Sequence, residues 1–186
     1  VNPSRGLGDV YKRQASNGVT VKCSGCSAGD QGVVGGVTYT AHDNTSIAAK
    51  NKNDNDWDRV VTTLVTDMSD LFRHQNTFNQ DISSWDTSNV VNMENMFYKA
   101  TSFNQPIGNW NMSSVTIIKG MFRLASSFNQ NISGWITSSV TNMNETFGEA
   151  SAFNSDIGNW DVSEVTNMNS LFYGCLLYTS DAADDK

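Results

Sequence analysis

The sequence predicts an α/β repeat protein: a solenoid of 25-residue units, each a short helix followed by a short parallel strand, behind a small N-terminal β cap. Large apolar residues return every 25 positions over most of the chain, and the first half of each unit has helical spacing. The second half is too short for another helix. Because one unit has a single apolar stripe and nothing to bury it against, several units must stack to fold.

The repeat is defined by residues that keep the same phase in every unit. We expect the aromatic and isoleucine columns to form one continuous core, because stacking places like side chains on like. The columns are Phe72, Phe97, Phe122 and Phe147; Phe78, Phe103, Phe128 and Phe153; Ile82, Ile107, Ile132 and Ile157; and Trp85, Trp110, Trp135 and Trp160.

The first half of each unit predicts a helix. Its apolar residues fall at i, i+3, i+6, i+7 and i+10, which is one face of a helix, and Ser88 or Asn89 could cap it. In one unit these residues are Val90, Met93, Met96, Phe97 and Ala100. The second half, residues 103–110, contains Asn, Gly and Pro and reads as a turn and a short extended segment.

An asparagine follows the second phenylalanine of each unit. We expect a ladder of buried side-chain amides that satisfy backbone groups at a turn, and ligand binding by these residues is the alternative. The column is Asn79, Asn104, Asn129 and Asn154.

Residues 15–63 precede the array of about four and a half repeats, residues 64–174. Val19–Cys23 alternates like a strand, Val33–Tyr39 reads as a hairpin around Gly-Gly, and Thr45–Lys50 as a short helix. We expect this segment to cap the first exposed core face. Cys23 and Cys26 form either a structural disulfide or two free thiols, because neither a thioredoxin-like context nor four zinc ligands accompany them.

Both ends resemble translated sequencing adapters, so we expect residues 1–14 and 175–186 to be artefact and the rest to be an internal fragment of a longer gene. In the 25-residue register, Cys175 falls in the alanine column and Tyr178 in the second phenylalanine column. We therefore expect Cys175–Tyr178 to cover the open end of the core.

The run Val-Thr-Asn-Met…Met-Phe…Ala…Phe-Asn-Gln…Ile…Trp-Asp, over Leu64–Gly174, resembles the repeat of BspA-like leucine-rich-repeat surface proteins, also met in Mycoplasma lipoproteins. Asn17–Cys23 is similar to the stretch before the array in Bacteroidetes members. The resemblance implies a leucine-rich-repeat-like solenoid, a secreted or surface location, adhesion to host or matrix proteins, and no catalytic residues. Single columns depart from the pattern, at Gln75, Ile118, Ile136 and Thr146.

Composition and motifs favour a binding module over an enzyme. The net charge of −7 argues against nucleic acid and anionic membranes as partners. No nucleophile elbow or phosphate loop is present, and Asp54, Asp56 and Asp58 lack the glycine and glutamate of a calcium loop. We expect no enzyme activity, no cofactor and no metal. The alternatives are a structural stalk or an accessory region of a larger secreted protein or enzyme.

Polar columns that vary between units are the candidate contacts for a partner. On the strand face we expect binding at two such columns, which are Asp81, Pro106, Asn131 and Asp156, and Asp86, Asn111, Ile136 and Asp161. The expected partner is an extracellular protein or glycan, and the expected location is extracellular or at the cell surface.

Overall fold

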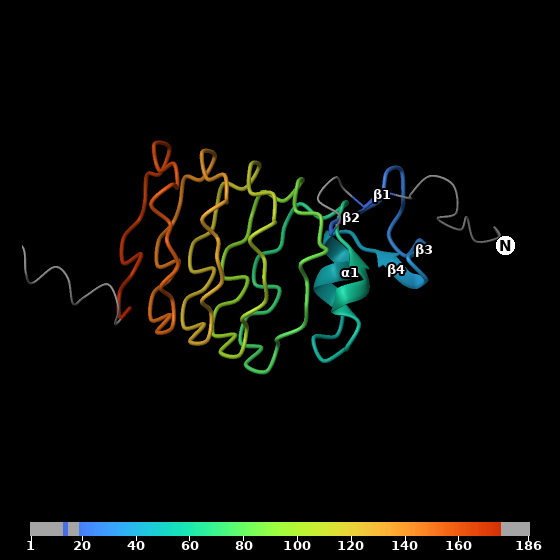
Figure 1. The fold of residues 1–186 in the computed structure, drawn as a ribbon, viewed down its shortest axis with the longest axis horizontal. Coiled ribbons are helices and arrows are strands. Elements are labelled where there is room, and N and C mark those ends of the chain that lie inside the picture. Colours follow the sequence, from blue (N-terminus) through green and yellow to red (C-terminus); the bar gives the residue numbers. More distant parts are fainter. Residues whose placement is uncertain (1–12, 15–18, 176–186) are drawn as a thin grey trace, which may run out of the picture.

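The computed structural model describes residues 13–14 and 19–175 (Figure 1). From residue 65 onward the chain winds in 25-residue turns that lie side by side along the long axis of the molecule. We call each turn a coil, counted from the valine column. Coils begin at Val65, Val90, Val115, Val140 and Val165.

The strands and the α-helix of the described residues lie before the coils. Strands β1 (Arg13–Gln14) and β2 (Val21–Lys22) pair antiparallel. A second, open sheet has the order β3–β4–β5, with β3 (Gln31–Val34) antiparallel to β4 (Val37–Ala41) and β5 (Val60–Val61) parallel to β4.

The predicted hairpin is present as β3 and β4. Val34 pairs with Val37 across a two-residue turn, in which Gly35 and Gly36 have φ of 58° and 82°. Both turn positions need positive φ, which glycine adopts without steric cost. The predicted strand before it is present as β2, and Cys23 and Cys26 form a disulfide.

Helix α1 (Asn44–Ala49) corresponds to the predicted short helix. It is held at its N-terminus by a capping box, in which Asp43 accepts from the Ser46 N–H and the Ser46 hydroxyl oxygen accepts from the Asp43 N–H. The 3-10 helix η1 (Trp57–Arg59) follows and leads directly into β5.

The prediction of a helix-plus-strand, leucine-rich-repeat-like solenoid is wrong. Residues 64–174, all of them described, contain no helix, and their β structure consists of isolated parallel bridges. The bridges join Asp67 to Asn92, Asn92 to Ile117, Ile117 to Asn142 and Asn142 to Asn167. The only α-helix of the described residues is the six-residue α1, outside the coils.

Two left-handed residues in every coil prevent the helix. They are Asp70, Asn95, Gly120, Glu145 and Ser170 in one column, and His74, Lys99, Leu124, Glu149 and Gly174 in the other. A left-handed residue costs about 1–2 kcal/mol for L-amino acids and interrupts a right-handed helix. The helical spacing of the apolar residues instead comes from consecutive tight turns, in which every second N–H bonds to the carbonyl three residues back.

Hydrogen bonds to the next coil replace those of a helix. Alternate amides of one coil, those of Met93, Asn95, Phe97 and Lys99, donate to carbonyls of the following coil at 2.8–2.9 Å. The amides between them close the turns, as the Met96 N–H does on the Met93 carbonyl at 3.3 Å. Each coil therefore satisfies its backbone only when the next coil is in register with it.

Side chains of the same column stack inside the coils. Phe97 lies 3.8 Å from Phe103 within its own coil and 5.6 Å from Phe122 in the next, measured between ring centroids. The Trp85 and Trp110 rings are stacked at 6.2 Å with an interplanar angle of 2°. All four predicted core columns lie inside the stack, and of their members only Ile157 is partly exposed.

The N-terminal segment covers the first coil and places side chains where a preceding coil would place them. Trp57 occupies the isoleucine column and packs edge-on against Phe72. The Asn44 side-chain oxygen accepts from the Thr66 N–H at 2.8 Å. The Gln80 side chain accepts from the Trp57 N–H and donates to the Asp54 carbonyl. In later coils the equivalent polar groups bond to the preceding coil. In the first coil, Thr66 and Gln80 bond to the N-terminal segment instead.

At the other end, Cys175 is buried in the alanine column, as its register predicted. Its N–H donates to the Phe172 carbonyl and its thiol to the Phe147 carbonyl at 2.8 Å. The remainder of the expected cover, residues 176–178, lies outside the described residues.

We expect Phe97→Ala to lower the free energy of unfolding by about 3–5 kcal/mol, because Phe97 is fully buried and its removal leaves a cavity between two coils. Urea unfolding followed by tryptophan fluorescence measures the change. Val91→Ala, at an exposed position of the same coil, is the control and should change stability by less than about 0.5 kcal/mol. Equal effects of the two substitutions would contradict the packing described here.

Candidate binding surface

The first predicted binding column mainly closes turns. Asp81, Asn131 and Asp156 are exposed, and each accepts on its side-chain oxygen from the N–H two residues later, at 2.9–3.1 Å. This is the Asx turn that Asp and Asn favour. Pro106 replaces the turn-closing residue in its coil and is exposed. Stacking brings the column together, but its polar members already have a structural role.

The second predicted column is divided between turns and the interior. Asn111 and Asp161 are exposed and close Asx turns with Ser113 and Ser163. The Ser163 amide and hydroxyl lower the pKa of Asp161. Ile136 is 59% exposed. Asp86 alone is buried, and it is not available to a partner from solution.

Asp86 joins the N-terminal segment to the coils. Its carboxylate lies 3.0 Å from the Lys22 ammonium of β2 and accepts from the Thr63 hydroxyl at 2.9 Å and the Ser88 hydroxyl at 2.7 Å. Burial would raise the pKa of Asp86, but hydrogen bonds from Ser88, Lys22 and Thr63 outweigh it and lower the pKa. The charged carboxylate is therefore the form that the fold stabilises.

The asparagine ladder is present at the surface instead of in the interior. The side-chain oxygens of Asn79, Asn104 and Asn129 each accept from the N–H of the asparagine one coil later, at 2.8–3.0 Å. A second ladder is buried, in which each tryptophan indole N–H donates to the isoleucine-column carbonyl of the preceding coil. Its members are Trp85, Trp110, Trp135 and Trp160, at 3.0–3.2 Å. Both ladders use these groups to join one coil to the next.

Residue type changes most on a different surface, which the sequence analysis did not single out. We call it the variable face. It consists of four columns around the two left-handed positions, and its members are Ser69, Glu94, Lys119 and Asn144; Asp70, Asn95, Gly120 and Glu145; Arg73, Tyr98, Arg123 and Gly148; and His74, Lys99, Leu124 and Glu149.

The variable face carries every Lys and Arg residue between positions 64 and 174. Its centre is Tyr98, whose ring lies between the guanidinium groups of Arg73 at 5.2 Å and Arg123 at 5.6 Å. His74 meets the same ring edge-on at 5.1 Å. These side chains come from three successive coils, so only stacking brings them together. The sequence does show that residue type varies in these columns. This surface was missed because these positions were assigned to a helix and binding residues were expected on the strand face.

Ion pairs orient the charged groups of this face. Arg73 pairs with Asp70 at 3.2 Å and Arg123 with Glu145 at 2.6 Å. Lys119 pairs with Glu94 of the preceding coil at 2.8 Å, which raises the pKa of Lys119. Because these side chains are partly exposed, the pairs add little to stability. They do hold the two guanidinium groups beside Tyr98.

Lysines of the N-terminal segment have structural partners too. The Lys52 ammonium donates to the carbonyls of Ile47, Ala48 and Lys50 at the C-terminal end of α1, where a cation is favourable. Burial lowers the pKa of Lys52 to about 8. Lys50 binds Asp54 and Asp56, so a lysine holds the turn that resembles a calcium loop. In the part of the chain that the structure describes, no three His, Cys, Asp or Glu side chains gather as metal ligands would.

A family model described as "Mycoplasma protein of unknown function, DUF285" matches residues 40–136 and again residues 109–185. The chain belongs to the DUF285 family. The first DUF285 match begins within β4 and takes in α1, η1 and β5, so the capping elements fall in the matched region together with the coils. No curated protein and no solved structure matches the chain. Among residues 13–14 and 19–175, no helix is long and apolar enough to cross a membrane.

We expect Asp86→Asn to remove part of the acid sensitivity of folding. A carboxylate whose pKa is lowered by folding stabilises the protein above its unfolded pKa, near 3.8, and this contribution is lost as the pH falls through the folded pKa. The wild type should therefore lose more stability than the variant as the pH falls from about 5 to 2. Urea unfolding at several pH values measures both, and parallel curves would contradict this assignment.

Proposed function

We propose that this DUF285 chain is a non-catalytic module of a cell-surface or secreted protein, and that its variable face binds an extracellular protein. One observation carries the proposal. Most buried columns repeat the same residue from coil to coil, as the phenylalanine and tryptophan columns do, whereas the columns of the variable face change charge, size and aromaticity. A repeated core serves stacking, and a surface that differs at each step provides the variety that specific recognition needs.

Tyr98 and its flanking arginines are the proposed anchor of the interface. Tyrosine and arginine are enriched among the residues that dominate protein–protein binding energy. Here Tyr98 is half-buried between Arg73 and Arg123, and ion pairs restrain both arginines. Restraint before binding reduces the entropy that binding must overcome.

The surface location rests on the resemblance to BspA-like surface proteins, together with the Mycoplasma family match. The Cys23–Cys26 disulfide supports it, since disulfides persist mainly in oxidising compartments. The absence of enzyme activity is part of the same proposal. It is supported by Asp86 and Lys52, whose shifted pKa values have structural causes and whose polar atoms bind other parts of the chain.

We expect the immobilised chain to capture protein from a solubilised extracellular-matrix extract, with Tyr98→Ala reducing the captured amount about tenfold. Asp161→Asn is the matched control, because it changes an exposed residue on another surface and keeps an oxygen that can close the same turn. Capture measured by quantitative mass spectrometry should be unchanged in the control. Equal capture by both variants would contradict the anchor, and no capture at all would favour a structural stalk.

A further inference from the structure

The outer edge of β3 has backbone groups without a partner. In a hairpin with a two-residue loop, the pair beside the loop is hydrogen-bonded and the pairs alternate from there. Gly32 and Val34 therefore face β4, whereas the N–H and C=O groups of Gln31 and Val33 face outward. The 2.8 Å bond from the Ala41 N–H to the Asp30 carbonyl fits this alternation. β3 is the edge strand of its sheet, and these outward groups bond to no described residue.

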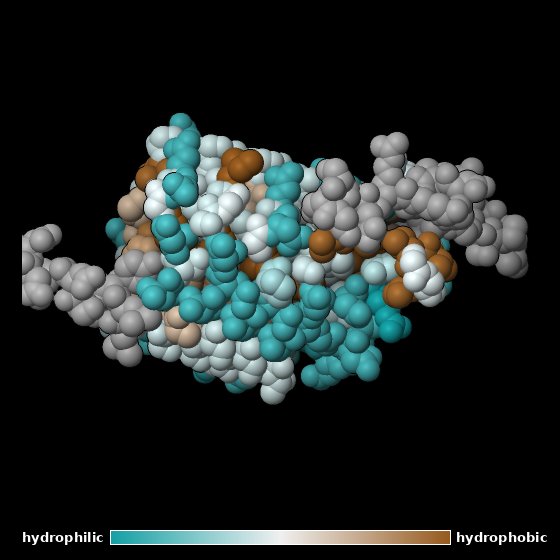
Figure 2. Space-filling model, in the orientation of Figure 1, coloured by the Kyte–Doolittle hydropathy of each residue, from teal (hydrophilic) through white to brown (hydrophobic). Residues whose placement is uncertain are grey.

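This edge lacks the features that usually protect an exposed strand. Proteins block such edges with charged side chains, proline or a bulge. The segment 31–41 contains no charged residue and no proline, and β3 and β4 pair without interruption. Val33 is 60% and Val37 37% exposed. Figure 2 shows hydrophobic residues gathered over this hairpin, at the end of the molecule away from the last coil.

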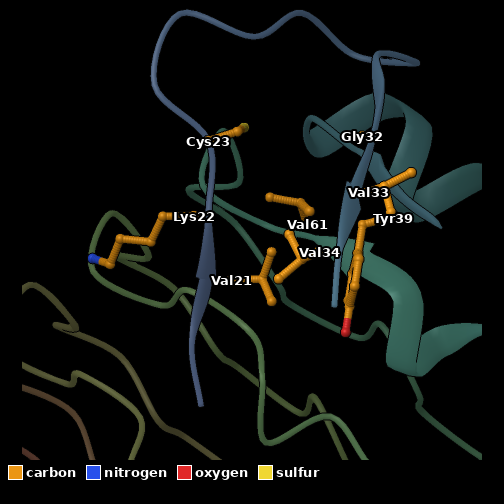
Figure 3. A pocket seen from close by; sticks show the side chains of 8 residues that line it. All are labelled: Val21, Lys22, Cys23, Gly32, Val33, Val34, Tyr39 and Val61. Atoms are coloured by element: carbon orange, nitrogen blue, oxygen red, sulfur yellow. The ribbon is translucent and has the colours of Figure 1, made fainter. Parts of the chain in front are cut away.

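An apolar hollow lies beside the same edge. Figure 3 shows Val21, Val34 and Val61 directed toward one another between β2 and β3, with Tyr39 alongside and Lys22 pointing away. The hollow is open and measures about 260 Å³ with its solvent-filled mouth included. Gly32 also lines it and contributes no side chain. A strand added to β3 would close this space, and an aliphatic side chain opposite Gly32 would enter it.

We propose that the outer edge of β3 pairs antiparallel with β3 of a second copy of this chain, around a twofold axis at Val33. The outward N–H of each Val33 then donates to the carbonyl of the partner's Val33. In this register the partner's Val34 lies opposite Gly32, beside the hollow, and the exposed Val33 side chains of the two copies lie against each other. The two three-stranded sheets join into one of six strands.

A second copy fits this edge because β3 supplies what the edge requires. The edge needs an extended, uncharged strand with an aliphatic side chain two residues from a glycine, and Gly32-Val33-Val34 is such a strand. Each copy carries a net charge of −7, so two copies repel each other over most of their surfaces. They can approach most easily through an uncharged region. The hairpin is such a region, at one end of the molecule.

Sedimentation equilibrium of the full chain over a concentration series tests this pairing. We expect a concentration-dependent rise from the monomer mass of 20.4 kDa toward twice that value. Val33→Pro should abolish the rise, because the proline removes an N–H that the hairpin itself does not use. Val33→Lys should weaken association at least about tenfold, since it places two cations at the axis.

Val37→Lys is the matched control. It adds the same charge to the same hairpin at another exposed valine, away from the outer edge, and association should stay within about threefold of the wild type. Thermal unfolding of each variant shows that the hairpin is retained. A wild-type mass of 20.4 kDa at every concentration would overturn the proposal, and so would equal association of the Val33→Lys and Val37→Lys variants.

Discussion

Hydrogen bonding between successive coils is the constraint on which the rest of this structure depends. Alternate amides of each coil donate to carbonyls of the next, while the amides between them close tight turns. Because the turns include two left-handed residues, a lone coil would bear their steric cost without compensation. The neighbouring coil supplies that compensation through these bonds and the stacked aromatic rings. A coil can therefore fold only when it is aligned in register with its neighbour.

The same constraint separates structural from variable residues. Columns that point into the stack repeat, since each ring must fit the ring before it. Polar columns that close a turn or bridge two coils, such as Asn104 and Asp156, are nearly as restricted. The positions around the two left-handed residues are less restricted, because their backbone amides make the hydrogen bonds between coils and their side chains pair only at the surface, as Lys119 does with Glu94. Tyr98 and Arg123 occupy such positions, and the scaffold presents both side chains partly exposed.

Features that follow from the 25-residue repeat or from a local motif could be predicted from the sequence. Features that follow from contacts between coils could not. The 25-residue phase located the core columns, Gly35-Gly36 located the hairpin, and the phase of Cys175 anticipated its burial. The helix was wrong, because consecutive tight turns and a helix give the same apolar spacing. Asn95 and Gly120 tolerate positive φ and hinted at the difference, but Lys99 and Leu124 carry no such signal. The turn-closing role of Asp81 was missed, because an Asx turn is not visible in an isolated sequence.

Amide hydrogen exchange of the folded chain tests the account of the coils most directly. The account predicts slow exchange at Met93, Asn95, Phe97 and Lys99, repeated one period later at Ile118, Gly120, Phe122 and Leu124, because these amides donate to the next coil. It also predicts that backbone chemical shifts across these residues lack a helical run. An uninterrupted protected stretch over residues 90–100 with helical shifts would contradict it, because that pattern would mean that the hydrogen bonds lie within each unit and not between coils.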